Sequence, residues 1–139
     1  MNQVVYVSRG GNTKKLAESI ARGAGTAAVP VERYAAQGST DILYVGASIY
    51  AGSIDPKMRE FLAGLNASEV KRVVVFGTSA GKKSALPEVK SILEPRGVAV
   101  SDDAFHCRGA FLLANRGRPS EEDLKQAETF AAGIGERRA

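Results

Sequence analysis

Six consecutive residues near the start of the chain have the composition of an anion-binding turn. They read Ser8-Arg9-Gly10-Gly11-Asn12-Thr13, so two glycines lie between hydroxyl-bearing residues. An apolar run precedes the turn and an amphipathic pattern follows it, which predicts a strand, a turn and a helix N-terminus. Backbone N–H groups, hydroxyls and the positive helix end could together bind a phosphate. The alternative is a glycine-rich turn in which Asn12 or Thr13 caps the helix.

Two later segments are also rich in small residues, and each follows an apolar run. Residues 46–53 read Gly-Ala-Ser-Ile-Tyr-Ala-Gly-Ser, and residues 77–82 read Gly-Thr-Ser-Ala-Gly-Lys. In an open parallel sheet, ligands bind beyond the carboxyl ends of the strands, where the strand order reverses. Small side chains there let the backbone approach a flat ligand closely. We therefore expect the three loops to enclose one ligand.

The rest of the chain alternates between strand and helix patterns. Short runs rich in β-branched residues predict strands at 4–7, 42–45, 73–76 and 98–100, with a weaker candidate at 29–32 whose Pro30 suits a sheet edge. Apolar spacing predicts helices over Leu16 to Ala24, Met58 to Leu65, Leu86 to Leu93 and Leu124 to Ile134. The connection over 34–40 is too short for a full crossover helix. This alternation predicts a doubly wound parallel sheet.

Capping residues mark two of these helix starts. Asp55 precedes Pro56, which suits a first helical turn, and Ser120 and Asp123 have the spacing of a reciprocal capping pair.

Size and composition restrict the class of protein. The 139 residues, 44% of them hydrophobic, can close one core, so we expect one domain over 1–139. No apolar run approaches the roughly 20 residues of a membrane span, and the first residues lack a signal-peptide profile, which favours a soluble cytoplasmic protein. One cysteine, Cys107, and one histidine, His106, exclude a disulfide framework and provide too few ligands for structural zinc. We expect no metal.

The net charge of +4 does not by itself indicate nucleic-acid binding. Lysines and arginines occur singly or in pairs, only 6% of residues are aromatic, and there is no tryptophan. A basic stripe interleaved with stacking residues is therefore missing. We attribute the charge to a solvated surface that faces an acidic partner or an anionic ligand.

Three common phosphate-binding classes are disfavoured. Residues 77–83 read Gly-Thr-Ser-Ala-Gly-Lys-Lys, which is one residue short of a Walker A loop and has lysine where the magnesium-binding hydroxyl belongs. Gly10 and Gly11 are adjacent, with no third glycine in place for a dinucleotide fingerprint. The acidic residues of a phosphoacceptor receiver domain are absent after the first and third strands.

The first turn resembles the phosphate loop of flavodoxins, usually Ser/Thr-x-Thr-Gly-x-Thr, and the three loops fall in the order in which that family encloses FMN. Residues 46–52 also resemble the corresponding loop of the flavodoxin-like protoporphyrinogen oxidases. The resemblance covers essentially the whole chain. It implies an α/β flavodoxin-like fold, with a five-stranded parallel sheet of order 2-1-3-4-5 and helices on both faces. It also implies an FMN-binding electron carrier that acts between redox partner proteins.

The resemblance assigns FMN contacts loop by loop. Backbone amides of 9–13, with the hydroxyls of Ser8 and Thr13, would hold the phosphate. Tyr50 would stack on the isoalloxazine, unless it packs against the following helix, and Gly52 would allow a peptide flip at Ala51-Gly52 or serve only as a turn glycine. The third loop would line the pyrimidine side of the ring. The expected contacts are Ser8, Arg9, Gly10, Gly11, Asn12, Thr13, Ser48, Ile49, Tyr50, Ala51, Gly52, Thr78, Ser79, Ala80, Gly81 and Arg108.

Two departures from the family pattern are visible. Gly10 stands where a hydroxyl residue is usual, and the chain is basic where flavodoxins are acidic. Positive charge near the ligand, from Arg9, Lys82 and Arg108, would stabilise the reduced anionic flavin. We therefore predict a reduction potential less negative than that of an acidic flavodoxin.

The last strand region contains the remaining candidates for chemistry. Adjacent His106 and Cys107 would point to opposite faces of a strand, which argues against a catalytic pair and favours Cys107 as a buried apolar residue. Asp102 and Asp103 are expected to form a turn rather than an acid/base pair. No residue demands a catalytic role.

Two further functions stay open beside the electron carrier. One is an FMN-dependent oxidoreductase acting on a quinone or a tetrapyrrole, suggested by the similarity of residues 46–52 to the protoporphyrinogen oxidases. The other is a non-redox module that binds a phosphorylated ligand or a protein. The sequence leaves the oligomeric state open.

Overall fold

The computed structural model describes residues 1–50, 52–79, 81, 83–109 and 117–138, with side chains described up to residue 135.

Five parallel strands form the main sheet. They are β1 (Asn2–Tyr6), β2 (Ala28–Pro30), β3 (Ile42–Gly46), β6 (Val73–Ser79) and β7 (Val100–Arg108). Their order is β2-β1-β3-β6-β7, and each neighbouring pair is parallel. The short strands β4 (Ile49–Tyr50) and β5 (Ser53–Ile54) form a separate antiparallel pair. Taken in chain order, the five strands of the main sheet therefore confirm the predicted order 2-1-3-4-5.

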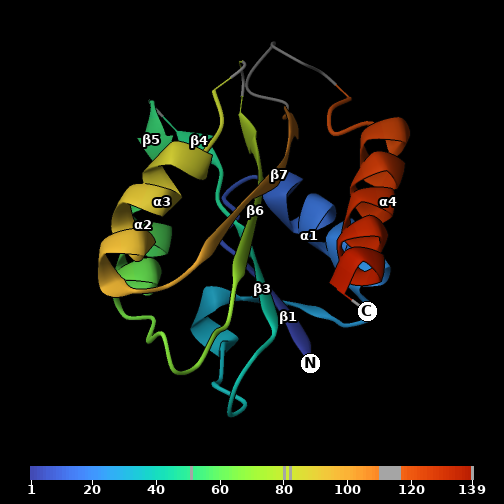
Figure 1. Cartoon of the computed structure of the whole chain (residues 1–139). Coiled ribbons are helices and arrows are strands. Elements are labelled where there is room, and N and C mark those ends of the chain that lie inside the picture. The colour runs from blue at the N-terminus through green and yellow to red at the C-terminus, as the bar shows by residue number, and fades with distance from the viewer. Residues whose placement is uncertain (51, 80, 82, 110–116, 139) are drawn as a thin grey trace.

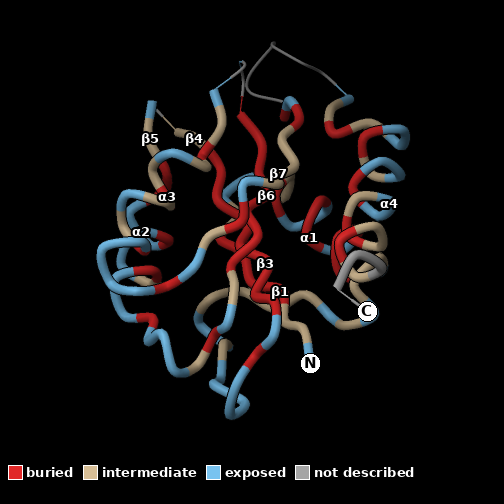
Figure 2. The backbone as a smooth tube through the Cα atoms, in the orientation of Figure 1, coloured by how far each residue is buried: buried red, intermediate tan, exposed pale blue. Residues whose placement is uncertain are grey.

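Helices cover both faces of this sheet, as predicted. Helices α1 (Asn12–Ala24) and α4 (Glu121–Arg138) lie on one face, and α2 (Pro56–Ala63) and α3 (Leu86–Leu93) lie on the other (Figure 1). The described residues also include two short 3₁₀ turns, η1 (Val31–Arg33) and η2 (Glu94–Arg96). The short connection that follows β2 thus contains η1 and no full helix. Figure 2 shows the buried residues concentrated in the central strands and on the helix sides that face them.

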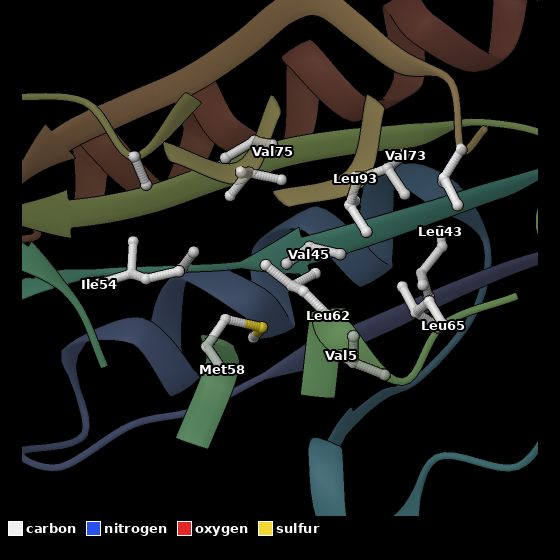
Figure 3. Close-up of a cluster of buried hydrophobic side chains, with 14 of the residues drawn as sticks. Val5, Leu43, Val45, Ile54, Met58, Leu62, Leu65, Val73, Val75 and Leu93 are labelled. Atoms are coloured by element: carbon white, nitrogen blue, oxygen red, sulfur yellow. The ribbon is translucent and has the colours of Figure 1, made fainter. Parts of the chain in front are cut away.

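Strand periodicity divides the core into two clusters. Val5, Val45 and Val75 point to the α2 and α3 side, where they pack with residues such as Met58 and Leu62 (Figure 3). Their neighbours Val4, Tyr44 and Val74 point to the α1 and α4 side. Tyr6 and Tyr44 are buried, and the burial of Cys107 confirms its prediction as a buried apolar residue. Since successive strand residues face opposite sides, near-continuous apolar runs are what a sheet covered on both faces requires.

Four local predictions need correction. The strand predicted over 98–100 begins only at Val100, because β7 covers Val100–Arg108. Asp102 and Asp103 lie inside β7 and do not form a turn, although the register with β6 is irregular there, because Val73 pairs with Val100 while Val75 pairs with Ala104. The extra residues are accommodated as a bulge in the strand. The weak strand at 29–32 ends at Pro30, where η1 follows. Strand β6 continues to Ser79, so Thr78 and Ser79 belong to the strand as well as to the expected third loop.

Candidate functional site

Helix α1 begins at a glycine and not at a capping side chain. Gly11 occupies the N-cap position with φ 88°, and among the described residues no side chain caps it. The Gly11 N–H instead donates to Ser8 Oγ at 3.1 Å, which closes the turn on itself. The capping alternative for Asn12 and Thr13 is therefore wrong, since both lie inside the helix. An α-helix leaves its first N–H groups without intrahelical acceptors, so this end is suited to an anion.

The glycines of the loops differ from those of the strands in the space around them. A Cβ built on Gly10, Gly11, Gly52 or Gly81 would meet no atom within 4 Å. A Cβ on Gly77 would lie 2.1 Å from the Ala47 carbonyl oxygen, and one on Gly46 would lie 2.7 Å from the Phe76 ring. The strand glycines thus permit close packing. The loop glycines border open space, so a ligand could approach the backbone there.

Three predicted site residues meet through their hydroxyl groups. Thr13 Oγ1 and Ser48 Oγ are hydrogen-bonded to each other, and Ser48 Oγ lies 3.0 Å from Thr78 Oγ1. The Thr78 N–H also donates to Ser48 Oγ at 3.1 Å. All three residues are buried. This chain of hydroxyls joins the first turn of α1 to the loop after β3 and to β6, so Thr13 is linked to the other two loops.

Arg9 reaches from the first loop to the second. Its Nε donates to Asp55 Oδ2 at 2.7 Å, and its guanidinium carbon lies 4.7 Å from the centre of the Tyr50 ring. Asp55 caps α2 by accepting a hydrogen bond from the Lys57 N–H at 2.9 Å. The charge of Arg9 is therefore balanced by a carboxylate, and its guanidinium covers a face of Tyr50.

The second and third loops are also connected. The Lys83 ammonium donates to the Gly52 carbonyl. Ser79 Oγ donates to the Gly81 carbonyl at 2.9 Å and lies 2.8 Å from His106 Nε2. The His106 ring also hydrogen-bonds to the backbone of Lys83. His106 thus contacts residues on either side of the third loop.

Electrostatic surroundings shift the pKa of three side chains near the loops. Burial alone would raise the pKa of Asp55, but the hydrogen bonds from Arg9 and the Lys57 amide bring it below the ordinary value. Burial lowers the pKa of His106, although its hydrogen bond to the Lys83 backbone acts in the opposite direction. Burial raises the pKa of Cys107 to about 12. Cys107 is therefore a protonated thiol at neutral pH and not a nucleophile.

The other predicted residues surround this network. Ile49 and Tyr50 form β4, and Ile49 packs against the core. Arg108 ends β7 and lines a cavity of about 380 Å³ together with Gly81 and His106. A cavity of about 300 Å³ beside the first loop is lined by Ser8, Gly11, Lys14, Lys57 and neighbouring residues. Ala51, Ala80 and Lys82 lie outside the described residues.

A larger cavity, of about 460 Å³, lies at the other end of the strands, near Met1, Asp41 and Lys71, where β1, β3 and β6 begin. It contains none of the predicted site residues. We place the candidate site at the three loops because the uncapped start of α1, the buried hydroxyls and the charged side chains lie there.

The sequence prediction missed three residues that shape the site. Asp55 was recognised as a helix cap, but its partner lies 46 residues away. Lys83 gave no local signal beyond its charge. A Cβ on Gly109 would lie 3.1 Å from Thr78 and 3.3 Å from the Asn12 amide nitrogen, so glycine allows the end of β7 to approach the loops. The only indication in the sequence was that Gly109 follows the last strand region, which contains His106 and Cys107.

Comparison with protein families identifies the chain. The profile of the Flavodoxin domain matches residues 3–112, and the chain belongs to this family. Membership of this family implies a flavin cofactor. A search of curated proteins gave no match. No helix among the described residues is both long and apolar enough to cross a membrane.

Solved structures share the fold at low sequence identity. A flavodoxin from the domain Archaea is 20% identical with a TM-score of 0.80, over 98% of this chain and 96% of that one. Oxidised Flavodoxin 1 from Bacillus cereus is 19% identical with a TM-score of 0.72, over 97% of each chain. Two-electron reduced flavodoxin from Megasphaera elsdenii is 19% identical with a TM-score of 0.64, over 96% of this chain and 99% of that one.

Proposed function

We propose that the chain is a single-domain cytoplasmic carrier that binds FMN and passes electrons between partner proteins. The observation that carries the proposal is the start of α1. Gly11 stands at the cap position in place of a capping side chain, and both Gly10 and Gly11 border open space. The family supports a flavin, and the solved relatives include one oxidised and one two-electron reduced flavodoxin.

The residues of the three loops divide the work. The first-turn amides of α1 and the Ser8 hydroxyl hold the phosphate, while Tyr50 stacks on the ring system. Gly52 and Gly81 leave room for the backbone to approach the ring edge. When bound, FMN supplies the redox chemistry by accepting and donating electrons. The buried hydroxyls of Thr13, Ser48 and Thr78 keep the three loops in register.

The partner proteins are expected to be acidic. Lys14, Lys57, Lys83 and Arg108 are exposed on or next to the loops. Cations around an exposed flavin edge would steer a negatively charged partner toward it, with rates that fall as salt increases. The same charges favour a reduction potential less negative than that of acidic flavodoxins. The pairing of Arg9 with Asp55 leaves Lys83 and Arg108 as the cations that we expect to contribute most.

Titration of the apoprotein with FMN tests the proposal directly. We expect saturable binding with quenched flavin fluorescence, followed by reversible reduction in an anaerobic potentiometric titration. Protein that shows no affinity for FMN would refute the flavin site and favour a non-redox module. Steady-state turnover of protoporphyrinogen or a quinone without any partner protein would favour the oxidoreductase over the carrier.

A further inference from the structure

Arg9 makes its two described contacts outside the turn to which it belongs. Its Nε donates to the Asp55 carboxylate at 2.7 Å, and its guanidinium lies 4.7 Å from the centre of the Tyr50 ring. Tyr50 ends β4, and Asp55 directly precedes α2. One side chain therefore joins the first loop to the β4–β5 hairpin and to the helix that follows it.

The acceptor of this contact is itself fixed. The Asp55 side chain is only 5% exposed, whereas that of Arg9 is 59% exposed. Asp55 Oδ1 accepts from the Lys57 N–H, and the Asp55 carbonyl accepts from the N–H groups of Met58 and Arg59. Because the carboxylate and the backbone carbonyl of Asp55 both accept hydrogen bonds from α2, Arg9 is oriented by a rigid partner. Leaving that partner would strand a buried carboxylate, which is costly.

Tyr50 benefits from this arrangement. A guanidinium over one face of a tyrosine ring attracts the ring and restricts its rotation. Stacking on a flavin would then use the face of the Tyr50 ring opposite Arg9. Fixing a ring before a ligand arrives reduces the conformational entropy that binding must overcome. Any flat aromatic ligand would gain from it, whether or not the ligand carries a phosphate.

We propose that Arg9 is a positioning residue, which holds Tyr50 and the β4–β5 hairpin ready for the flavin ring and does not bind the phosphate. This inference rests on the proposed function, since it requires a flavin at the three loops. Arg9 thus belongs to the turn that we expect to bind the phosphate, but it acts on the binding of the isoalloxazine ring.

Riboflavin, which lacks the phosphate, separates the two roles. We expect R9M to weaken the binding of FMN and of riboflavin by the same factor, about tenfold. D55N retains a capping oxygen but loses the charge that holds Arg9, so it should also weaken both ligands. If Arg9 bound the phosphate, R9M would weaken FMN alone and D55N would strengthen FMN by releasing Arg9. Either of those results would overturn the proposal.

Arg22 offers a matched control. Its side chain is also 59% exposed and forms an ion pair with Glu128 at 3.0 Å, but it lies in the last turn of α1. R22M should leave both flavin affinities unchanged, while thermal unfolding of the apoproteins reports any general loss of stability. R9K, which keeps the charge but not the planar guanidinium, should bind both flavins with intermediate affinity and is the variant of choice if R9M folds poorly.

The outcomes distinguish this inference from the proposed function. Wild-type protein that binds neither FMN nor riboflavin contradicts the proposed function. Wild-type protein that binds both, with unchanged riboflavin affinity in R9M, leaves the proposed function standing and overturns the role of Arg9.

Discussion

Helices α1 and α4 pack side by side on one face of the sheet, yet they begin in opposite ways (Figure 1). At the start of α4, the Asp123 N–H donates to Ser120 Oγ at 3.1 Å, and the Ser120 N–H donates to Asp123 Oδ2 at 2.7 Å. At the start of α1, Gly11 takes the cap position and no described side chain caps it. The start of α4 therefore has a reciprocal side-chain cap, and the start of α1 has none among the described residues.

The difference shows how a helix end can serve either stability or binding. A reciprocal cap is worth up to about 2 kcal/mol of stability, because it satisfies amides that the helix leaves without acceptors. A glycine at the cap position gives up only roughly a few tenths of a kcal/mol relative to a capping side chain. It places no side-chain oxygen at the helix end, so the positive end can serve a ligand. The buried contacts of Leu16 and Ile20 then secure α1 in place of a cap.

The largest expected effect comes from giving α1 a carboxylate of its own. G10D meets no steric obstacle, because a Cβ at this position has no atom within 4 Å. The new charge would compete with the phosphate for the helix end and repel it, so FMN affinity should fall about a hundredfold while riboflavin affinity changes little. Fluorescence titration measures both. G10A is the control, and an equal loss of FMN affinity in G10A would show that charge is not the cause.

The next effect is expected at the other helix. D123A removes the side-chain acceptor of the Ser120 N–H, although the N–H of residue 123 can still donate to Ser120 Oγ. It also removes the partner of Arg118, whose Nε lies 2.5 Å from Asp123 Oδ2. The free energy of unfolding should fall by about 2 kcal/mol, as measured by urea denaturation, with FMN affinity unchanged. E122Q, at an exposed first-turn position, should have little effect. A marked loss of FMN affinity in D123A would mean that the two helix starts are not independent.

A smaller loss of stability is expected beneath the loops. S48A would remove the shared partner of Thr13, Thr78 and the Thr78 N–H. We expect about 1.5 kcal/mol less stability, because buried polar groups would lose a hydrogen bond. FMN affinity should fall as well, since the three loops would no longer be held in fixed positions relative to one another. S91A, at an exposed serine, controls for the loss of a hydroxyl, and equal stability of S48A and S91A would contradict the importance of the buried chain.

Acid should act mainly on capping carboxylates. Burial would raise the pKa of Asp123, but Arg118 and Ser120 lower it below the ordinary value of 3.8, and Asp55 is lowered in a comparable way by Arg9 and Lys57. A carboxylate with a lowered folded-state pKa adds stability above its ordinary pKa and loses it as the pH falls through the folded-state value. Stability should therefore decline below about pH 3.8. The decline should be shallower in D123N, and an unchanged profile would contradict this assignment.

Local patterns predicted most of the fold from sequence. Apolar runs such as Val73 to Phe76 located the central strands, because a sheet covered on both faces leaves no polar positions within them. The caps at Asp55 and at Ser120 with Asp123 were also foreseen and confirmed, because capping depends on residues close in sequence. The placement of three loops at one edge followed from the parallel order of the strands.

Contacts across the sequence escaped prediction. The hairpin of Ile49–Tyr50 with Ser53–Ile54 was expected only as a loop, since two-residue strands carry no periodicity. Arg9 is expected from the sequence to add positive charge near the ligand, but its ion pair with Asp55 is not predictable, because sequence indicates charges and not their partners. Asp102 and Asp103 predict a turn, since carboxylates rarely occur in strands, yet an edge strand with a bulge tolerates them.

The bulge in β7 also bears on how copies of the protein behave when crowded. Strand β7 borders the sheet on one side, and short β2, which ends at Pro30, borders it on the other. A neighbouring chain that tried to extend the sheet at β7 would meet an interrupted register and the exposed carboxylate of Asp102. At β2 it would meet a residue without an N–H. Both edges therefore discourage strand-by-strand aggregation.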